Sequence, residues 1–428
     1  MAQTNDSGPN DSGPNAPAIE TEVLVVGGGL VGATLGCALA GADIDTVVVD
    51  REEPEKVQAA EFDGRGSAIA AGSRHMMEAI GLWAEVGDQA QPILDISVTD
   101  GKIGRRPSLL MLHYDHREVG EAMGHIVENR RLRQAQHRLM PQLPNLTLLA
   151  PLGVDRVVRT QHRAVATLSD GRKVHARLVA GCDGRNSPLR KDAGIRTAHW
   201  TYPQSGVVAT LQHEKPHHGV AYEHFLPSGP FAMLPMVDGP NGEHRSSIVW
   251  TEKRALAERA YQLPDATFSR EVLRRFGIRH GDVKPIGPRF RYPLSGLHAE
   301  RYVDTRLALV GDSAHAIHPI AGQGLNLGLR DVAALAECVV DARRLGLDIG
   351  APEVLERYQR WRRPDNMTLV AATHTLDYLF SNDIAPIRLA RDLGLGIVNG
   401  IGPLKKVFMR HAMGMLGDLP RLIRGEAL

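Results

Sequence analysis

The most regular hydrophobic pattern lies near the start of the chain. A β-rich run at residues 22–26 stops at three glycines, and an apolar-periodic stretch at 30–40 follows. A second β-branched run, residues 46–49, ends at Asp50. This order of strand, helix and strand predicts a βαβ unit at the beginning of the fold.

Beyond this unit the alternation is less regular. The patterns predict helices at 68–83 and 129–140, and strands at 93–99, 146–149, 153–158, 164–168 and 178–181. Between 206 and 250, β-rich runs alternate with Gly/Pro turns, which indicates an antiparallel sheet in a second domain. A β run at 307–310 then precedes a helical stripe made of Leu325, Leu329, Val332, Leu335 and Val339, so the first domain is expected to be discontinuous.

The composition of the chain limits its expected partners and its expected location in the cell. The chain has 428 residues, 43% of them hydrophobic, and its 50 basic and 49 acidic residues cancel, which argues against nucleic acid as a partner. Three cysteines without metal-ligand spacing fit a reducing compartment, and we find neither a signal peptide nor a run of about 18 apolar residues. We therefore expect a cytoplasmic protein, in which any membrane contact is peripheral and local, for example through the basic stretch at 405–424.

The first chemical motif is Gly27-x-Gly29-x-x-Gly32, between the first predicted strand and helix. In that position glycines allow a tight turn and let backbone N–H groups approach a pyrophosphate. Asp50 is placed to accept hydrogen bonds from ribose hydroxyls. The motif does not separate FAD from NAD, and although Arg51 hints at a 2′-phosphate, Asp50 would repel one.

A second cluster favours FAD. The β run that starts after Arg306 ends in Gly311-Asp312, and Gly322-Gln323-Gly324 then opens a helix. A carboxylate at a strand end can hold the ribityl chain, while a helix N-terminus can face the flavin edge that becomes anionic on reduction. Such a helix end stabilises negative charge by up to about 2 kcal/mol.

These motifs carry a family resemblance. The run from His318 to Asp331, HPIAGQGLNLGLRD, resembles the signature of the ubiquinone-biosynthesis hydroxylases, within the flavin monooxygenases that are similar to para-hydroxybenzoate hydroxylase. The segment CDGxxSxxR, which begins at Cys182, is similar to the Asp-Gly motif that this class uses near FAD and NAD(P)H. The resemblance covers nearly everything from Glu22 onward, including DGRGSAI around Arg65 and the segment 389–395.

Pattern and resemblance together imply an α/β (α+β) fold with a Rossmann-like FAD-binding domain, a mainly antiparallel-sheet substrate domain and a helical C-terminal region. The tandem repeat NDSGP near the start predicts a disordered tail at 1–20. The expected FAD-binding domain comprises 21–95, 125–195 and 286–365, the substrate domain 96–124 and 196–285, and the helical region 366–428.

The resemblance also implies the site residues. The expected cofactor-binding residues are Gly27, Gly29, Gly32, Asp50, Arg51, Arg65, Arg130, Asp183, Gly311, Asp312, Gly322, Gln323, Gly324, Leu325 and Asn326. Arg131 and Arg133 are alternatives to Arg130 beside the pyrophosphate. His318, Pro319 and the Gly322 loop are expected near the isoalloxazine, and neither a catalytic side chain nor a metal is expected, because the flavin carries the chemistry.

The implied activity is FAD-dependent hydroxylation of the aromatic ring of a polyprenylated phenol in ubiquinone biosynthesis. Dioxygen is the co-substrate, and electrons come from NAD(P)H, either directly or through a redox partner. The ring carbon and membership of a quinone-biosynthesis complex stay open. The alternatives are a flavin-dependent reductase or oxidase of another isoprenoid or aromatic substrate, and a flavin-binding assembly subunit without turnover.

Two further groups of side chains are candidates for a functional role. His113, His116, His217 and His218 are interpreted as surface histidines rather than metal ligands, because no carboxylate accompanies them at helical ligand spacing. Trp200, Tyr202, Phe225, Met233 and Trp250 fit either a substrate cavity or a sheet core.

Overall fold

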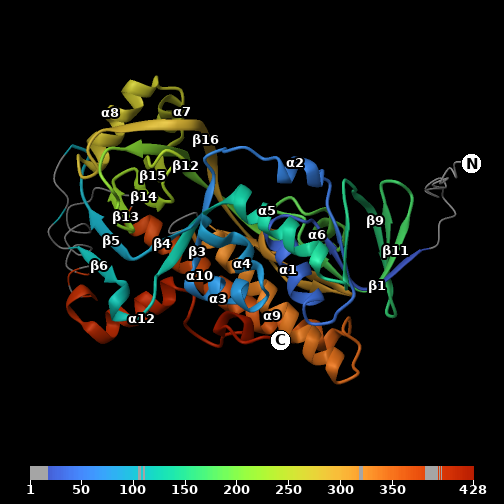
Figure 1. Ribbon diagram of the computed structural model, residues 1–428. Coiled ribbons are helices and arrows are strands. Elements are labelled where there is room, and N and C mark those ends of the chain that lie inside the picture. Colours follow the sequence, from blue (N-terminus) through green and yellow to red (C-terminus); the bar gives the residue numbers. More distant parts are fainter. Residues whose placement is uncertain are drawn as a thin grey trace, which may run out of the picture.

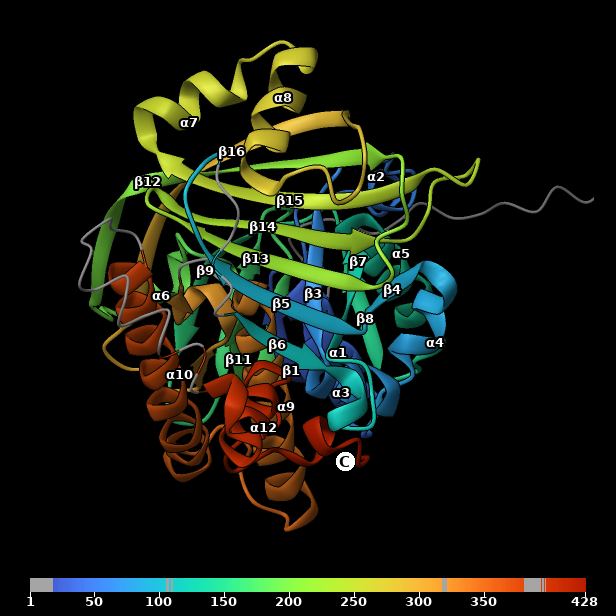
Figure 2. The same ribbon diagram turned by 90° about the vertical axis from the view of Figure 1, so that its left-hand side faces the viewer.

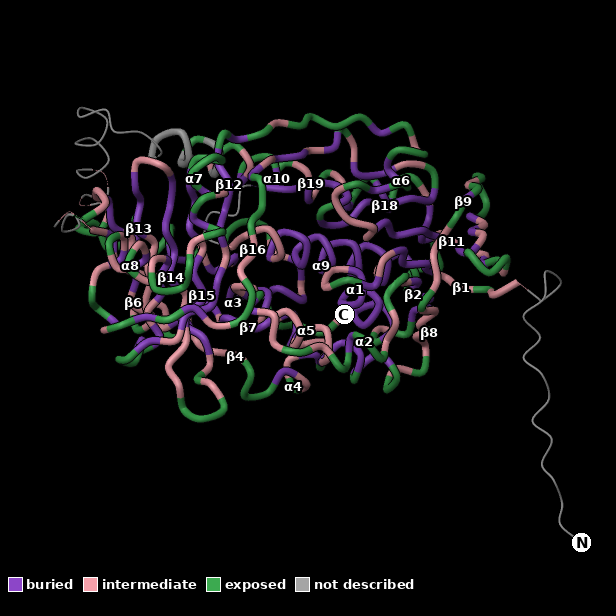
Figure 3. Tube along the Cα trace, turned by 90° about the horizontal axis from the view of Figure 1, so that it is seen from above, coloured by how far each residue is buried: buried purple, intermediate pink, exposed green. Residues whose placement is uncertain are grey.

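The computed structural model describes residues 18–104, 108, 111–317, 322–380, 394, 396 and 398–428. The strands of these residues form two large sheets and one small sheet. The two large sheets lie toward opposite ends of the molecule, with helices between and around them (Figure 1). Seen from above, buried chain runs through the centre of both halves (Figure 3).

The first sheet is mainly parallel. Its order is β17 (Val303–Asp304), β18 (Leu307–Leu309), β11 (Lys173–Gly181), β1 (Ile19–Val26), β2 (Thr46–Val49) and β8 (Leu146–Leu149), and β10 (Ala164–Leu168) and β9 (Val154–Arg159) extend it from β11. The predicted βαβ unit is confirmed, with β1 and β2 parallel. The expected tail at 1–20 is wrong at its end, because Ile19 already pairs with Val174.

The helix α1 (Leu30–Ala40) packs on β1, β2 and β8 of this sheet, and α5 (Asn129–Leu139) and α9 (Gln323–Arg344) pack against α1. The predicted apolar stripe lies in α9, but burial extends around almost the whole helix. The reason is that α9 packs between α1 and α10 (Pro352–Phe380), and a helix enclosed on several sides has apolar residues on several faces.

The second sheet is antiparallel except for one pair. Its order is β19 (His315–Ala316), β16 (Val283–Ala299), β12 (Thr197–His213), β15 (His244–Lys253), β14 (Gly229–Met236), β13 (Val220–Leu226), β5 (Asp95–Asp100) and β6 (Leu112–Asp115), with β13 and β5 parallel. The expected domain boundary at 285/286 falls inside β16, which pairs with β12 along its length.

The two faces of this sheet have different roles. One face packs under α7 (Arg254–Tyr261) and α8 (Asp265–Phe276), as Figure 2 shows. On β14, for example, Phe231 and Met233 join the core with these helices, whereas the alternate residues Ala232 and Leu234 line a large cavity on the opposite face. The two-residue period of a strand therefore separates a structural face from a cavity face.

The prediction of one helix at 68–83 is wrong. The segment forms β3 (Gly66–Ala70), α3 (Ala71–Ala79) and α4 (Leu82–Val86), and β3 pairs with β7 (Gly124–Glu128), which also pairs with β4 (Ala90–Ile93) in the small sheet. Pairing with β7, 54 to 62 residues along the chain, makes β3 extended. Gly81, with a φ of +78°, then separates α3 from α4.

The described part of the C-terminal region contains helices joined by turns and irregular segments. Besides α10 it contains α12 (Gly402–Ala412) and the short η6 (Arg421–Arg424); two short helices, α2 (Pro54–Gln58) and α6 (Pro188–Asp192), lie earlier in the chain. Lys405 Nζ lies 2.5 Å from Glu118 Oε1, which joins α12 to the segment after β6. None of the described helices combines the length and apolarity needed to cross a bilayer.

Candidate active site

The glycine turn after β1 brings α1 against the preceding backbone. A Cβ on Gly32 would overlap the carbonyl oxygen of Gly27, and Gly27 has a φ of +100°, so the fold itself requires both glycines. Gly29 differs, because a Cβ there would meet no atom within 4 Å. Gly29 lines the cavity, and α1 has no side-chain cap, so its first backbone N–H groups are open to a ligand.

Asp50 lies directly beside this turn, at the carboxyl end of β2. A Cβ on Gly28 would come within 2.7 Å of Asp50 Oδ2, and Oδ1 accepts a hydrogen bond from the Glu52 amide (3.0 Å). Arg133 NH2 lies 4.0 Å from Oδ2, so among the three adjacent arginine candidates it is Arg133 that reaches Asp50. Arg51 is exposed at the surface.

The other two expected arginines are held by carboxylates near the cavity. Arg65 donates from Nε to Asp63 (2.7 Å), and its guanidinium lies 5.4 Å from the centre of the Phe290 ring. Arg130 donates from Nε to Glu128 (2.6 Å). Both arginines are therefore ordered without a ligand, and a ligand phosphate would have to share them with these carboxylates.

The second predicted loop forms the short helix η4 (Gly311–Ser313) against α1. Gly311 has a φ of +65°, and a Cβ there would lie 3.2 Å from Val31. Asp312 lines the cavity, and its surface is accessible although many protein atoms surround its carboxyl group. Burial raises the pKa of Asp312, and the charges of His315 and Arg185 oppose the rise.

A cluster of buried polar side chains forms hydrogen bonds with this loop. Asp331 of α9 accepts hydrogen bonds from the Gly311 amide (3.1 Å), His315 Nε2 (2.5 Å), Arg362 Nε (2.9 Å) and Asn366 Nδ2 (3.1 Å). Burial alone would raise the pKa of Asp331, but His315 and Arg362 outweigh it and hold the pKa well below its ordinary range. The sequence motif contains Asp331, but its partners on α10 carried no signal of their own.

Asp183 lies behind the same loop. Its Oδ2 accepts a hydrogen bond from the Leu189 amide (3.1 Å), whereas Oδ1 is buried and has no hydrogen-bond partner among the described residues. Burial raises the pKa of Asp183. Arg190, of the same motif, donates to the Ser313 carbonyl (2.7 Å), so this segment also supports η4. An orphaned buried acceptor of this kind indicates a donor that a bound group would supply.

One cavity of about 1400 Å³ joins these features. On the side of the first sheet it is lined by Gly29, Leu30, Asp312, Gly322, Gln323, Gly324 and Leu325. On the other side it is lined by the free face of the second sheet. The volume exceeds the roughly 300–1,000 Å³ typical of one small-molecule site, so the cavity has room for a cofactor ring and a substrate together.

The residues present fit FAD. The open Gly29 turn, Asp312 and the uncapped N-terminus of α9 line this side of the cavity, and Asp50 lies beside the glycine turn. Asn326 lies outside the lining and bonds to the Ala70 amide (2.9 Å) and the Ala68 carbonyl (2.8 Å) of β3, so it supports the loop. His318 and Pro319 lie outside the described residues, as does most of the segment 389–395.

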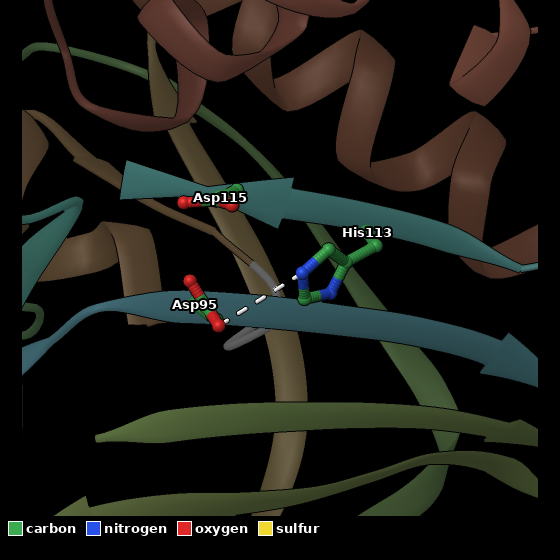
Figure 4. Close-up of side chains that lie close together, drawn as sticks. All are labelled: Asp95, His113 and Asp115. Carbon is green, nitrogen blue, oxygen red and sulfur yellow. Dashed lines mark ion pairs between the residues drawn. The ribbon is translucent and has the colours of Figure 1, made fainter. Parts of the chain in front are cut away.

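Two of the four candidate histidines, His217 and His113, lie in different environments. His217 is buried and its Nε2 contacts the Met236 carbonyl (2.9 Å), so the prediction of a surface histidine is wrong there. Figure 4 shows His113 beside Asp95 of β5 and Asp115 of β6, with Nε2 3.9 Å from Asp95 Oδ2. We assign no metal to this group, because Arg117 already engages both carboxylate oxygens of Asp115.

The five aromatic and sulfur-containing residues that fit either a substrate cavity or a sheet core lie in different places. Phe225 lines the cavity, whereas Met233 and Trp250 belong to the core beneath α7 and α8. Trp200 donates from Nε1 to the Tyr202 hydroxyl (2.9 Å), and neither residue is among those that line the cavity. The cavity interpretation therefore holds for Phe225 and the sheet-core interpretation for Met233 and Trp250.

Comparisons with known proteins agree with this geometry. Residues 20–373 match the family model described as "FAD binding domain". The chain is 53% identical to "Ubiquinone hydroxylase UbiL" of Rhodospirillum rubrum, over 95% of this chain and 93% of that protein. It is 34% identical to "3-demethoxyubiquinol 3-hydroxylase" of Escherichia coli, over 92% and 99% of the two chains. The solved structure of p-nitrophenol 4-monooxygenase PnpA from Pseudomonas putida has the same fold, with a TM-score of 0.75 and 18% identity over 92% of this chain and 98% of that one.

Proposed function

The chain belongs to the FAD-dependent hydroxylases of ubiquinone biosynthesis, and from this premise we propose that it hydroxylates the ring of a polyprenylated phenol inside the large cavity. The observation that carries the proposal is the cavity itself. It has the candidate FAD residues on one side and a mainly apolar sheet face on the other. Such a cavity suits a substrate made of one small ring and a long hydrocarbon chain.

The roles of the cofactor residues follow from their positions. Gly29 and the N-terminus of α1 would receive the pyrophosphate, Asp50 the ribose, and Asp312 the ribityl chain. The N-terminus of α9, which has no side-chain cap, would stabilise negative charge on the flavin ring. Reduced FAD supplies the activation of dioxygen and the transfer of one oxygen atom.

The second sheet provides the environment for this reaction. The strand residues Val208, Ala232, Leu234 and Val249 form an apolar surface opposite the flavin side. A surface of this kind excludes water, which would otherwise reach the reacting centre and favour release of peroxide. It also leaves the substrate ring to be oriented by the few polar groups that line the cavity.

The entrance for the substrate is proposed beside α12. Leu404, Val407 and Phe408 are 37%, 47% and 45% exposed on this helix, and Phe408 also lines the cavity. Lys406 and Arg410 are exposed on the same helix. Apolar residues next to cations suit the headgroup region of an anionic bilayer, so we place the membrane contact here (Figure 2, red).

The electron donor is proposed to be NAD(P)H, which acts on the bound flavin directly or through a redox partner. Assembly into a quinone-biosynthesis complex is proposed as well, because the substrates and products of successive ring modifications stay in the membrane. In such a complex, each product would pass to the next enzyme without release into the membrane. Neither proposal changes the assignment of the cavity.

Product analysis tests the hydroxylase proposal. The FAD-loaded protein is incubated with a short-chain prenylphenol, NADPH and isotopically labelled dioxygen, and the products are examined by mass spectrometry. We expect one labelled oxygen atom on the ring. A reduced side-chain double bond without label would support a reductase instead. Absence of any turnover, together with full rescue of a deletion strain by a variant that binds no FAD, would support an assembly role.

A further inference from the structure

The cavity face of the second sheet contains one carboxylate. Along β13, Ala221, Glu223 and Phe225 alternate toward the cavity. The residues paired with Glu223 on the two neighbouring strands are Val98 and Ala232, and both are apolar and line the cavity as well. Glu223 therefore lies in the middle of an apolar wall, where a carboxylate is costly unless a ligand uses it.

Glu223 has no polar partner among the residues that the structure describes. Within the described part of the chain, nothing donates a hydrogen bond to it or forms an ion pair with it, and its accessible surface opens into the cavity. The other titratable groups that line the cavity are Tyr114 of β6, Tyr222 of β13, Tyr292 of β16, Cys182, Arg185, Asp312 and His411 of α12. None of them shifts the pKa of Glu223, which burial raises from its ordinary 4.5 to about 7.

We propose that Glu223 accepts a hydrogen bond from the phenolic hydroxyl of the substrate and acts as its general base. This inference rests on the proposed function. As the ring attacks the activated oxygen, the phenolic proton passes to the Glu223 carboxylate, which becomes a neutral carboxylic acid. The electron pair of the O–H bond moves into the ring and increases its nucleophilicity. When the ring regains aromaticity, the hydroxylated carbon loses its proton to the second oxygen atom of dioxygen, which leaves as water, and Glu223 returns its own proton to the phenolic oxygen.

The chemistry of the pair supports this role. A phenol resembles the tyrosine side chain, whose pKa is about 10, so a carboxylate of ordinary basicity is a weak base toward it. A base with a pKa near the working pH is better matched to the transfer, and general-base catalysis of this kind contributes roughly a 100-fold to 10,000-fold rate increase. The same hydrogen bond fixes the orientation of the ring within a cavity whose lining is mainly apolar.

Two substitutions separate the two roles. Glu223→Gln keeps an oxygen acceptor but removes the base, so we expect kcat to fall about 100-fold while KM changes less than about threefold. Glu223→Leu removes the acceptor. Oxidised wild-type enzyme should bind a prenylphenol at least tenfold more tightly than its methyl ether, and Glu223→Leu should lose this preference. Glu223→Asp keeps a carboxylate and should recover part of kcat.

The pH profile gives a third readout. For the wild type, kcat/KM should rise as pH passes through about 7, where Glu223 ionises, and Glu223→Gln should lack this rise. Glu353→Gln, at the exposed start of α10, is the matched control and should leave both profile and preference unchanged. If Glu223→Gln retains kcat within threefold and the same inflection, the inference is overturned.

A measurement of thermal stability shows whether Glu223→Gln loses activity because it fails to fold. Because the folded pKa of Glu223 is raised, its ionisation destabilises the folded protein as pH rises from about 4.5 through 7. Glu223→Gln removes that cost, so its thermal midpoint should equal or exceed that of the wild type at pH 8. If wild-type enzyme oxygenates no phenol, the proposed function fails; if it does and the phenol preference survives in Glu223→Leu, only this inference fails.

Discussion

Arg362 donates from Nε to Asp331 Oδ1 over 2.9 Å, and both side chains are almost completely buried. Because Asp331 also accepts from the Gly311 amide, this ion pair connects α10 to the loop that holds Asp312. A buried pair of this kind contributes little net stability, but removal of one partner leaves an uncompensated charge.

We therefore expect Asp331→Asn to lower the free energy of unfolding by about 3 kcal/mol, because Arg362 and His315 lose their fully buried carboxylate and Arg362 keeps only the partly exposed Asp365 as a counter-charge. Denaturant unfolding monitored by circular dichroism measures the change. Asp170→Asn breaks a half-exposed pair with Arg172 and serves as control, with an expected change of about 0.5 kcal/mol. A loss below about 1 kcal/mol for Asp331→Asn would contradict the role of the pair.

The same carboxylate gives a pH-dependent prediction. The folded pKa of Asp331 is lowered, so its contribution is complete above the unfolded pKa of about 3.9 and is lost as pH falls toward the folded value. The stability difference between wild type and Asp331→Asn should therefore be constant from pH 5 to 7 and shrink below about pH 4. Urea titrations at pH 3 and pH 7 compare the two proteins directly. A difference that is equal at both values would exclude this linkage.

Gly29 and Gly32 should respond differently to alanine. In Gly29→Ala the new methyl group meets no protein atom but enters the cavity, so we expect an unchanged thermal midpoint without flavin and at least tenfold weaker FAD binding. In Gly32→Ala the methyl group overlaps the backbone of Gly27, and we expect a loss of about 2 kcal/mol or more. Fluorescence titration with FAD and calorimetry separate the two effects. Equal FAD affinity in Gly29→Ala would argue against a pyrophosphate at this turn.

Asp312→Ala should weaken FAD retention while the fold stays intact, since its carboxyl faces the cavity and not the core. We expect roughly tenfold or more loss in affinity, measured as flavin-to-protein ratio after gel filtration and by titration. Asp312→Asn keeps a hydrogen-bonding group and should lose less. Full flavin occupancy in the alanine variant would remove Asp312 from the site.

The proposed membrane contact is testable on α12. Burial of one large apolar side chain contributes about 1.5 to 3 kcal/mol, so Phe408→Asp should reduce binding to anionic lipid vesicles at least tenfold in a sedimentation assay. Ile278, which is 77% exposed on the other side of the second sheet, provides the control variant Ile278→Asp. Equal vesicle binding by both variants would place the contact elsewhere.

Local signals were readable from the sequence, and distant pairings were not. The βαβ unit, the glycine turn and Asp50 lie within about thirty residues, so spacing alone was sufficient. The strand nature of β3 depends on pairing of Ile69 with His125, which no local pattern contains. The cavity wall could not be predicted for the same reason, since it consists of alternate residues from several strands. The position of Glu223 within an apolar surface is recognised only when its neighbours Val98 and Ala232 are known.

The two longest strands, β12 and β16, set the depth of the cavity. Each has 17 residues, they pair with each other, and the far end of β16 pairs with β19 directly after η4. The loop that carries Asp312 and the wall that carries Glu223 are thus parts of one hydrogen-bonded frame. Because such a frame holds these two parts at a set separation, we expect the protein to discriminate between substrate rings of different size and to accept hydrocarbon tails of different length.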